Sequence, residues 1–474
     1  MFGDKESILK VLSLYNPWWR FGEIQKEYKK PIKRKAYYQV KEVLGHRDIR
    51  RFVLLTGARR VGKTTILYQE IENLLENGIE SKNILYVSFD NPILKFNTLN
   101  EIVEIYKNNI ALNESVYLFL DEIQYSKDWN NWLKVLYDTD VNVSVVATGS
   151  ASPIISKGVV ESGTGRWVTV TVPTLSFYEY CLLKEVNIDL NIKISDIRSL
   201  SEKDLYQIVN SLKHLQREFN RYITVGGFPE LVLANDERYA QRILREDIVD
   251  KVLKRDIPEL YNIRNIAMLE KVFLYLCFNS SNIINYTNMC QLLDNASLQT
   301  VQEYIRYLES ANLIYINEPI YTNGTSVLKS KPKIYIVDAA IRNAVLMRED
   351  ILTDADELGY VVETVVFRHV KTYYTIEQIG YYRDGNKENR EIDVIVKGIK
   401  NNKFIEVKYR ERTNIDSNNP IYELPKNNDE IYIVTKNDTD YSIKEFENGN
   451  KIIRIPAFVY LYLLGKEEYE NFYK

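Results

Sequence analysis

The sequence contains few of the residues that bind structural metals. Its 474 residues include three histidines and three cysteines, Cys181, Cys277 and Cys290, and no two cysteines form a CxxC pair. Because structural zinc needs four such ligands at short spacings, a zinc site is not expected. The scarcity of cysteine is also typical of a protein that works in a reducing cytoplasm.

Long apolar runs are lacking as well. A membrane-spanning helix needs about 18 or more consecutive apolar residues, and the longest run here is AFVYLYLL at 457–464. We expect this run to form a buried C-terminal segment. The first residues, MFGDKESILK, lack the apolar centre of a signal peptide. The sequence therefore predicts a cytoplasmic protein with no membrane partner.

The chain also has little excess charge of either sign. Its net charge is −3, although 27% of its residues are charged. The protein as a whole is therefore not a polyanion binder, and any contact with nucleic acid must come from local basic patches. One basic run, KEYKKPIKRKAYYQVK, lies within residues 1–45, which we expect to form a helical arm. Such a run is usually a solvated face, and contact with phosphate or a partner is the alternative.

The length of the chain predicts about two to four domains of α/β type. Within residues 46–180, short apolar runs alternate with helical patterns. The runs RFVLLTG, ILYVSFD, SVYLFLD and VNVSVVATGS each end in a small or polar residue. This rhythm is typical of a parallel sheet whose strands are buried on both faces and whose chemistry lies at their carboxyl ends.

A phosphate-binding loop follows the first of these strands. The stretch GARRVGKTT fits G-x-x-x-x-G-K-[ST] between a strand and a helix, which is the context the motif needs. Backbone N–H groups of such a loop surround phosphates, Lys63 is expected to reach the outer phosphates, and Thr64 is expected to hold Mg²⁺. The predicted loop residues are Gly57, Ala58, Arg59, Arg60, Val61, Gly62, Lys63, Thr64 and Thr65.

The stretch VYLFLDEIQ provides acidic groups for the same site. Asp121 ends an apolar run and is expected to bind Mg²⁺ through water, while Glu122 is placed to polarise the attacking water. The pair could also be an ordinary solvated strand end. After a phosphate-binding loop, adjacent aspartate and glutamate favour a hydrolase over a small-molecule kinase.

Two further positions are candidates for contact with the γ-phosphate. Ser150 lies at the polar end of VVATGSAS, where a residue can sense that phosphate. Arg166, in GTGRW, is a candidate arginine finger, with a surface ion pair as the alternative. Arg59 and Arg60 are other possible charge donors, and the sequence does not rank these three arginines.

Residues 181–265 are predicted to be mostly helical, with a tight turn at VGGFPE. Residues 266–332 have the order of a winged helix-turn-helix, with a longer helix starting near Ser297. A strand pair is expected to follow in LIYINEPIYTNGTSVL, with Asn-Gly at its turn. Residues 333–474 alternate strands and helices and form a separate α/β unit.

The presumed recognition helix carries little positive charge. Its outward positions include Gln299, Gln302, Glu303 and Arg306, whereas DNA-reading helices usually carry more basic residues. After the wing, LKSKPK supplies three lysines that could lie on phosphates, namely Lys329, Lys331 and Lys333. The helix-turn-helix therefore either contacts DNA or serves packing or protein interaction.

A second constellation lies near the C-terminus, in EIDVIVKGIKNNKFIEVKY. A hairpin centred between Ile399 and Lys400 places Asp393 opposite Glu406, and Glu391 opposite Lys408. Facing carboxylates can bind a divalent cation, and a neighbouring lysine can orient water or stabilise a developing charge.

Glu363 is the one acidic residue of the apolar helix predicted in LGYVVETVVFRHV, where burial is costly without a partner or a metal. The order helix-Glu363, strand-Asp393 and strand-Glu406-x-Lys408 resembles the PD-(D/E)xK, restriction-endonuclease-like fold. The alternative is a ladder of cross-strand salt bridges on a solvated sheet.

Nearly the full length resembles the predicted AAA+ superfamily ATPases that are common in archaea and bacteria. The resemblance rests on NPWW, GARRVGKTT, FLDEIQ, ATGSAS, GR before VPTLSFYEY, YITVGGFPELV, LKRDIPEL, KIYIVDAAIR, ELGYVVETVVFRHV, REIDVIV, FIEVKY and IPAFVYLYLLG. Such proteins join a P-loop ATPase to a winged helix and a restriction-endonuclease-like domain. The resemblance implies an oligomer, for example a hexameric ring, with Arg166 acting across a subunit boundary.

By this resemblance, Lys63, Thr64, Asp121 and Glu122 are the nucleotide and Mg²⁺ residues. Glu363, Asp393, Glu406 and Lys408 are the nuclease-type residues, with Mg²⁺ or Mn²⁺ between Asp393 and Glu406. Two functions are expected from these sites. One is an oligomeric ATP-hydrolysing enzyme that acts on DNA through a metal-dependent nuclease domain. The other is a nucleotide-driven switch or scaffold whose inactive nuclease fold binds DNA or protein.

Overall fold

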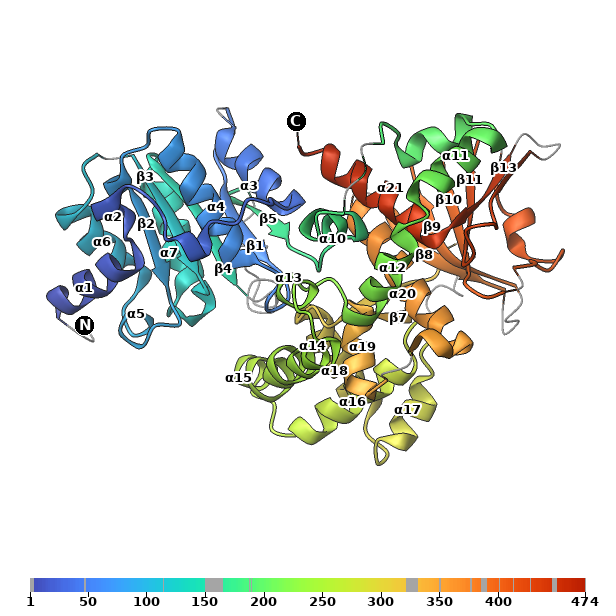
Figure 1. The fold of residues 1–474 in the computed structure, drawn as a ribbon. Coiled ribbons are helices and arrows are strands. Elements are labelled where there is room, and N and C mark those ends of the chain that lie inside the picture. Colours follow the sequence, from blue (N-terminus) through green and yellow to red (C-terminus); the bar gives the residue numbers. More distant parts are fainter. Residues whose placement is uncertain are drawn as a thin grey trace. The chain divides into compact units, whose positions relative to one another are not determined.

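The computed structural model describes residues 4–473 apart from 47, 114, 150–164, 187, 189, 321–330, 349–350, 376, 385–389, 400, 412, 427 and 446–449. The chain divides into two compact units (Figure 1). Unit 1 comprises Met1–Pro173 and Phe472–Lys474, and unit 2 comprises Thr174–Asn471. The five predicted regions divide the chain more finely and stay predictions. None of the helices in the described part of the chain has the length and apolarity to span a membrane.

Unit 1 is built on a parallel sheet with the strand order β2-β3-β4-β1-β5. The four strands predicted from apolar runs are confirmed, and their residues are almost all buried on both faces of the sheet. The fifth strand, which the run pattern did not predict, pairs with β1 at the sheet edge. The strand bounds are β1 Phe52–Thr56, β2 Ile84–Ser88, β3 Val116–Asp121, β4 Val143–Gly149 and β5 Trp167–Thr171.

Helices cover this sheet, and the predicted N-terminal helical arm is part of the cover. Helix α1 packs against β2, and α3 packs against β1 and β5 (Figure 1). Helix α4 begins directly after the glycine-rich loop. The helical elements are α1 Lys5–Tyr15, α2 Trp18–Phe21, η1 Lys26–Tyr28, α3 Lys35–Gly45, α4 Lys63–Glu76, η2 Ser81–Asn83, α5 Pro92–Lys95, α6 Leu99–Asn109, η3 Ile123–Tyr125 and α7 Trp129–Thr139.

The NPWW stretch closes the free edge of the sheet at β2. Asn16 is fully buried; its Nδ2 donates to the Tyr86 carbonyl over 2.8 Å, and its Oδ1 accepts from the Tyr86 N–H over 2.6 Å. The indole N–H groups of Trp18 and Trp19 both donate to the Ile84 carbonyl, over 3.1 and 2.9 Å. Side chains thus satisfy backbone groups that an edge strand would otherwise leave open.

Replacing Asn16 tests this edge closure. The Asn16→Ala substitution leaves the buried N–H and carbonyl of Tyr86 without these partners, so we expect the free energy of unfolding to fall by about 1–3 kcal/mol. Urea denaturation followed by tryptophan fluorescence measures the change. The matched control is Asn108→Ala on the exposed face of α6, and an equal loss in both variants would contradict the role given to Asn16.

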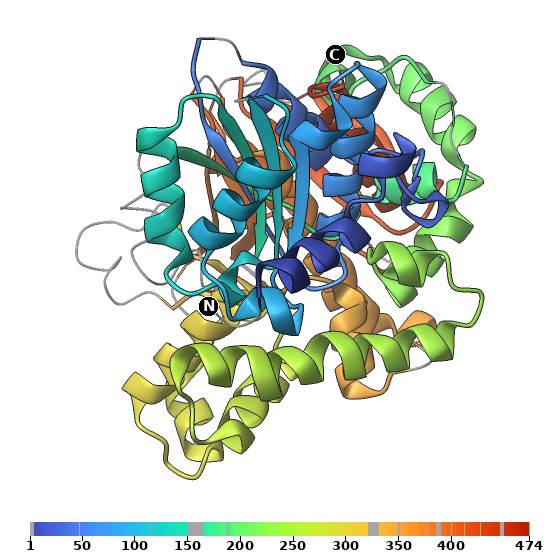
Figure 2. The ribbon, with the colours of Figure 1, turned by 90° about the vertical axis from the view of Figure 1, so that its left-hand side faces the viewer.

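Unit 2 begins with a helical region, as predicted for residues 181–265. Its longest helix runs through α14, η5, η6 and α15, and Figure 2 shows it as one continuous rod. The bounds are α10 Phe177–Leu183, η4 Ile194–Ser199, α11 Glu202–Leu212, α12 Leu215–Val225, α13 Pro229–Val232, α14 Glu237–Ile243, η5 Leu244–Asp250, η6 Val252–Asp256 and α15 Ile257–Tyr261.

The predicted helix-turn-helix segment contains α16 (Ile266–Phe278), α17 (Tyr286–Leu292) and α18 (Leu298–Ser310), followed by β6 (Ile314–Asn317). Ser297 caps α18, as the predicted start near that residue requires. The antiparallel partner of β6 is β7 (Lys333–Ile336), which lies beyond the expected strand pair. The predicted Asn-Gly turn and Lys329 fall outside the described residues.

Lys333, one of the three lysines that could lie on phosphates, is not at the surface. Lys331 is exposed, but only 2% of Lys333 is exposed, because β7 turns its side chain into unit 2. Lysines precede and begin the short strand KIYI, and a lysine-rich stretch is typical of a solvated segment. Nothing in the sequence therefore indicated that Lys333 is buried.

The C-terminal part of unit 2 holds a mixed sheet with the order β12-β13-β11-β10-β9-β8. Helices α20 and α21 pack on each other and against its strands. The predicted burial of 457–464 is confirmed, since every residue there is at most 1% exposed. The bounds are α19 Ala339–Leu346, η8 Ile351–Thr353, α20 Ala355–Tyr373, β8 Gln378–Arg383, β9 Glu391–Lys397, β10 Lys403–Lys408, η9 Pro420–Tyr422, β11 Glu430–Thr435, β12 Ser442–Glu445, β13 Lys451–Pro456 and α21 Ala457–Glu470.

The register of the β9–β10 hairpin is the predicted one. Ile405 pairs with Val394, and Lys403 pairs with Val396, so the hairpin centre falls between residues 399 and 400. Strand β11 then runs parallel to β10, whereas β8 is antiparallel to β9. Because the register is set by alternating side chains, it brings Asp393 and Glu406 to the same end of the hairpin.

Candidate functional site

The glycine-rich loop connects the end of β1 to the start of α4. Gly57 has φ +154°, and a Cβ atom there would lie 2.3 Å from the Val172 carbonyl oxygen; Gly62 has φ +97°. Side chains are therefore excluded at Gly57 and strained at Gly62. The loop brings the N–H groups of the α4 N-terminus to one place, which is a favourable position for a phosphate.

Lys63 is turned onto this loop. Its buried ammonium donates to the carbonyls of Gly57 and Ala58 over 3.0 and 2.9 Å. The N-terminal arm also holds the loop, because Arg34 donates to the Val61 carbonyl over 2.8 Å. Arg34 was not singled out from the sequence, where it is one cation in a long basic run.

Asp121 and Thr64 meet although they lie on different elements. The Thr64 hydroxyl donates to Asp121 Oδ2 over 2.8 Å, and the Tyr86 hydroxyl donates to the same oxygen over 2.9 Å. Burial raises the pKa of Asp121 and the charge of Glu122 adds to this, while hydrogen bonds from Thr148, Thr64 and Tyr86 act in the opposite direction. The hydroxyl and carboxylate are hard oxygen donors beside a phosphate-binding loop, so this pair fits Mg²⁺.

Glu122 follows Asp121 in a left-handed conformation with φ +52°. Its N–H donates to the Thr148 hydroxyl over 3.0 Å, and its carboxylate accepts from Gln124. Thr148 in turn donates to Asp121, so one residue at the end of β4 fixes both acidic positions. The candidate γ-phosphate sensor, Ser150, lies outside the described residues.

Arg166 is distant from the loop within its own chain. It precedes β5, and its carbonyl accepts from Phe52 at the start of β1, whereas the loop follows the end of β1. Five strand residues separate these ends, which is about 16 Å. Its guanidinium pairs with Asp138 over 2.9 Å. The role across a subunit boundary stays a prediction, as do the roles of Arg59 and Arg60.

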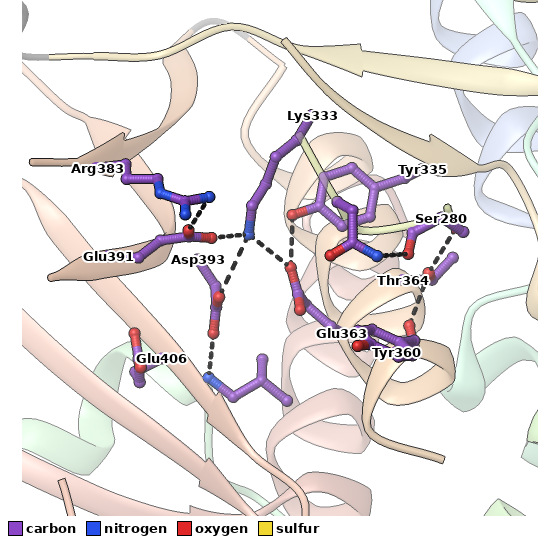
Figure 3. A network of polar contacts seen from close by, with 12 residues as sticks. Ser280, Lys333, Tyr335, Tyr360, Glu363, Thr364, Arg383, Glu391, Asp393 and Glu406 are labelled. Atoms are coloured by element: carbon purple, nitrogen blue, oxygen red, sulfur yellow. Dashed lines mark hydrogen bonds and ion pairs between the residues drawn. The ribbon is translucent and has the colours of Figure 1, made fainter. Parts of the chain in front are cut away.

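Unit 2 has a polar cavity of about 420 Å³. All four predicted nuclease-type residues line it, together with residues that the sequence had not linked to them. The lining includes Lys333, Glu363, Arg383, Glu391, Asp393, Glu406, Lys408 and Arg410. Figure 3 shows the core of this group.

Lys333 is the centre of the group. Its Nζ lies 3.1 Å from Glu363 Oε1, 3.5 Å from Asp393 Oδ1 and in contact with Glu391 (Figure 3). Burial opposes its charged form, but the carboxylates, Glu363 foremost, outweigh it and hold the pKa of Lys333 well above its usual value. Tyr335, two residues further along β7, also donates to Glu363 Oε1, over 2.8 Å.

The remaining predicted residues lie at the other side of Asp393. Asp393 Oδ2 accepts the N–H of Val407 over 2.9 Å, where the β9–β10 pairing has ended. Lys408 donates to Glu406 Oε1 over 2.5 Å, and Glu406 Oε2 is buried without a hydrogen-bond partner in the described structure. Burial, with the charge of Asp393, raises the pKa of Glu406 to about 8 and that of Glu363 to about 7.

Three carboxylates of this group converge on the Lys333 ammonium. Within the described residues, no three His, Cys, Asp or Glu side chains are placed to hold a metal ion. Glu363, Glu391 and Asp393 are directed at the Lys333 ammonium instead. While the ammonium is in place, the set therefore does not fit a divalent cation at that position, and metal binding by Asp393 and Glu406 stays a prediction.

Comparison with known proteins agrees with the site in unit 1. Residues 49–181 match the family model described as "AAA domain". This match agrees with the loop and the parallel sheet, which together support a P-loop fold of the AAA+ type in residues 49–181. Residues 216–351 and 358–458 match two domains of unknown function, DUF8612 and DUF4143. These matches leave the winged helix and the nuclease-like fold as predictions.

Relatives that match most of the chain are described as uncharacterized proteins. MJ1544 of Methanocaldococcus jannaschii is 27% identical over 416 residues, 85% of this chain and 86% of that protein. A Haemophilus influenzae protein is 26% identical over 417 residues, 85% of this chain and 94% of that protein. The solved structure of ORC2 from Aeropyrum pernix has a TM-score of 0.35 at 14% identity, covering 68% of this chain and 97% of that chain.

The raised pKa of Glu406 predicts a pH effect on stability. An unfolded glutamate has a pKa near 4.5, whereas the raised pKa of Glu406 keeps its proton in the folded state up to about pH 8. The folded state therefore binds the extra proton, and its stability falls as the pH rises between these values. Glu406→Gln should remove this fall, so that its stability relative to wild type is higher at pH 9 than at pH 5.

Thermal unfolding at both pH values measures the effect. The matched control is Glu445→Gln on the exposed strand β12, which should leave the pH dependence unchanged. A Glu406→Gln variant with the pH dependence of wild type would contradict the raised pKa.

Proposed function

We propose that unit 1 binds ATP and hydrolyses it with Mg²⁺. The observation that carries the proposal is the hydrogen bond from Thr64, at the start of the helix that follows the loop, to Asp121 at the end of β3. These two oxygen donors lie beside the lysine of a phosphate-binding loop, which is the arrangement that P-loop hydrolases use.

The residues have separate roles in this reaction. The loop N–H groups bind the phosphates, and Lys63 moves from the carbonyls of Gly57 and Ala58 to the outer phosphates. Thr64 and Asp121 hold Mg²⁺, which neutralises charge on the phosphates when bound. Glu122 accepts a proton from the attacking water and orients it, and Thr148 fixes the backbone position of Glu122.

The finer features of this proposal concern assembly. We expect Ser150 to contact the γ-phosphate and Arg166 to act as a finger on the nucleotide of a neighbouring subunit in a ring, for example a hexamer. Arg166 is distant from the loop of its own subunit, which supports a role at the nucleotide of a neighbouring subunit. The protein would work in the cytoplasm.

Two substitutions test the ATPase proposal. Lys63→Ala should weaken ATP binding and lower turnover by at least about 100-fold, because a preorganised charge on the phosphates is lost. Glu122→Gln should abolish turnover but retain binding, since Glu122 acts on water. Phosphate release and binding of a fluorescent ATP analogue measure the two effects.

The matched controls are Lys82→Ala and Glu104→Gln, which change exposed side chains of unit 1. Both should behave as wild type. Undiminished turnover in Glu122→Gln would show that another group is the base.

A second proposal concerns unit 2: a restriction-endonuclease-like fold that acts on DNA. Three antiparallel strands, β8, β9 and β10, are followed by the parallel strand β11, and α20 precedes them with Glu363. Asp393, Glu406 and Lys408 share one cavity with Glu363. One form of the proposal is metal-dependent DNA cleavage, with Mg²⁺ or Mn²⁺.

The other form is a fold that binds DNA or protein without cutting, under control of the ATPase. The contacts of Lys333 favour this form, because three of the carboxylates already share a protein cation. The winged helix would assist binding in either form.

Incubation of the protein with linear and branched DNA, Mg²⁺ or Mn²⁺, with and without ATP, separates the two forms. Cleavage that is lost in Asp393→Ala supports the nuclease. DNA binding without cleavage supports the binding form, and neither binding nor cleavage contradicts any action on DNA. The control is Asp294→Ala, whose side chain is 86% exposed.

A further inference from the structure

Lys333 lies on a strand outside the mixed sheet that carries Glu391 and Asp393. It starts β7, which pairs with β6 and makes a bridge to Ile283. Residues 333 and 335 point to the same face of this strand, and both side chains contact Glu363 (Figure 3). Strand β7 thus delivers one cation and one hydroxyl to a single carboxylate of α20.

The ammonium of Lys333 has three carboxylate neighbours. An ammonium has three N–H donors, and three carboxylates surround this one, those of Glu363, Glu391 and Asp393. Its side chain is 3% exposed, so the surrounding water contributes little to its solvation. A divalent cation in the same place would need these oxygen atoms as its own ligands.

We propose that Lys333 is the built-in cation of this carboxylate group and holds the place that a divalent metal would take. While its ammonium is in place, Glu363, Glu391 and Asp393 are turned towards it and bind no divalent cation. Removal of this charge creates a divalent-cation site from the same oxygen atoms. The relevance of this inference to DNA rests on the second proposed function. The inference itself concerns only the affinity of the carboxylate group for a metal.

A neighbouring group supports the inference independently of these ion pairs. Glu406 is 3% exposed and lines the same cavity, and its Oε2 has no hydrogen-bond partner among the described residues. Buried polar atoms normally have a partner. Glu406 thus places a further carboxyl group in the cavity that a cation would enter when Lys333 is gone.

The test replaces the ammonium while keeping the length of its stem, in Lys333→Met. Without nucleotide or DNA, this variant should bind one equivalent of Mn²⁺ at least about tenfold more tightly than wild type in a calorimetric titration. The gain should vanish when Glu391→Gln is added. In EDTA, the midpoint of thermal unfolding should fall by more than about 5 °C because buried carboxylates lose their partner, and Mn²⁺ should restore it.

The control is Lys331→Met, which removes an exposed lysine two residues away and should change neither quantity. Unchanged Mn²⁺ affinity in Lys333→Met overturns the proposal, and so does a variant that remains unfolded with Mn²⁺ present. When Lys333 is present, the single substitution Glu391→Gln should leave any Mn²⁺ binding unchanged. Loss of Mn²⁺ binding in that single variant would also overturn the proposal. None of these outcomes depends on DNA cleavage, so the two proposals fail separately.

Discussion

The hydrogen bond between Thr64 and Asp121 depends on the strand order of the sheet in unit 1. Asp121 ends β3 and the loop follows β1, but these strands are not neighbours, because β4 lies between them. Thr148 at the end of β4 donates to Asp121 and accepts from the N–H of Glu122, and so fixes the end of β3. The site therefore requires three buried parallel strands that end at the same level, with their edge at β2 closed by Asn16, Trp18 and Trp19.

In unit 2, several carboxylates line one cavity, and their charges must be compensated. Glu363, Glu391 and Asp393 share Lys333, and Glu391 also lies 3.5 Å from Arg383. Breaking such a buried pair costs about 3–5 kcal/mol, because the partner is left uncompensated. The charge balance of the cavity, more than any single contact, thus decides whether a metal can enter it.

The sequence predicted those features that are local or periodic. The loop, the four apolar strands, Asp121 at a strand end and the β9–β10 register follow from motif spacing and from alternation. The sequence did not predict β5, the partner strand of β6 or the burial of Lys333, because these depend on contacts between distant segments. Lys333 lies in a basic run typical of a surface, and its environment is set by Glu363, Glu391 and Asp393, at least 30 residues away. Likewise, nothing in NPWW itself indicates that it binds the edge of β2.

The central claim is that this chain hydrolyses ATP through a loop, a threonine and an aspartate that hold Mg²⁺. The most direct measurement is the release of inorganic phosphate from ATP by the purified wild-type protein, over a range of protein concentrations, with Mg²⁺ and with EDTA. The account predicts steady release with Mg²⁺ and none with EDTA. No release in either condition, at any protein concentration and with or without DNA, would contradict it.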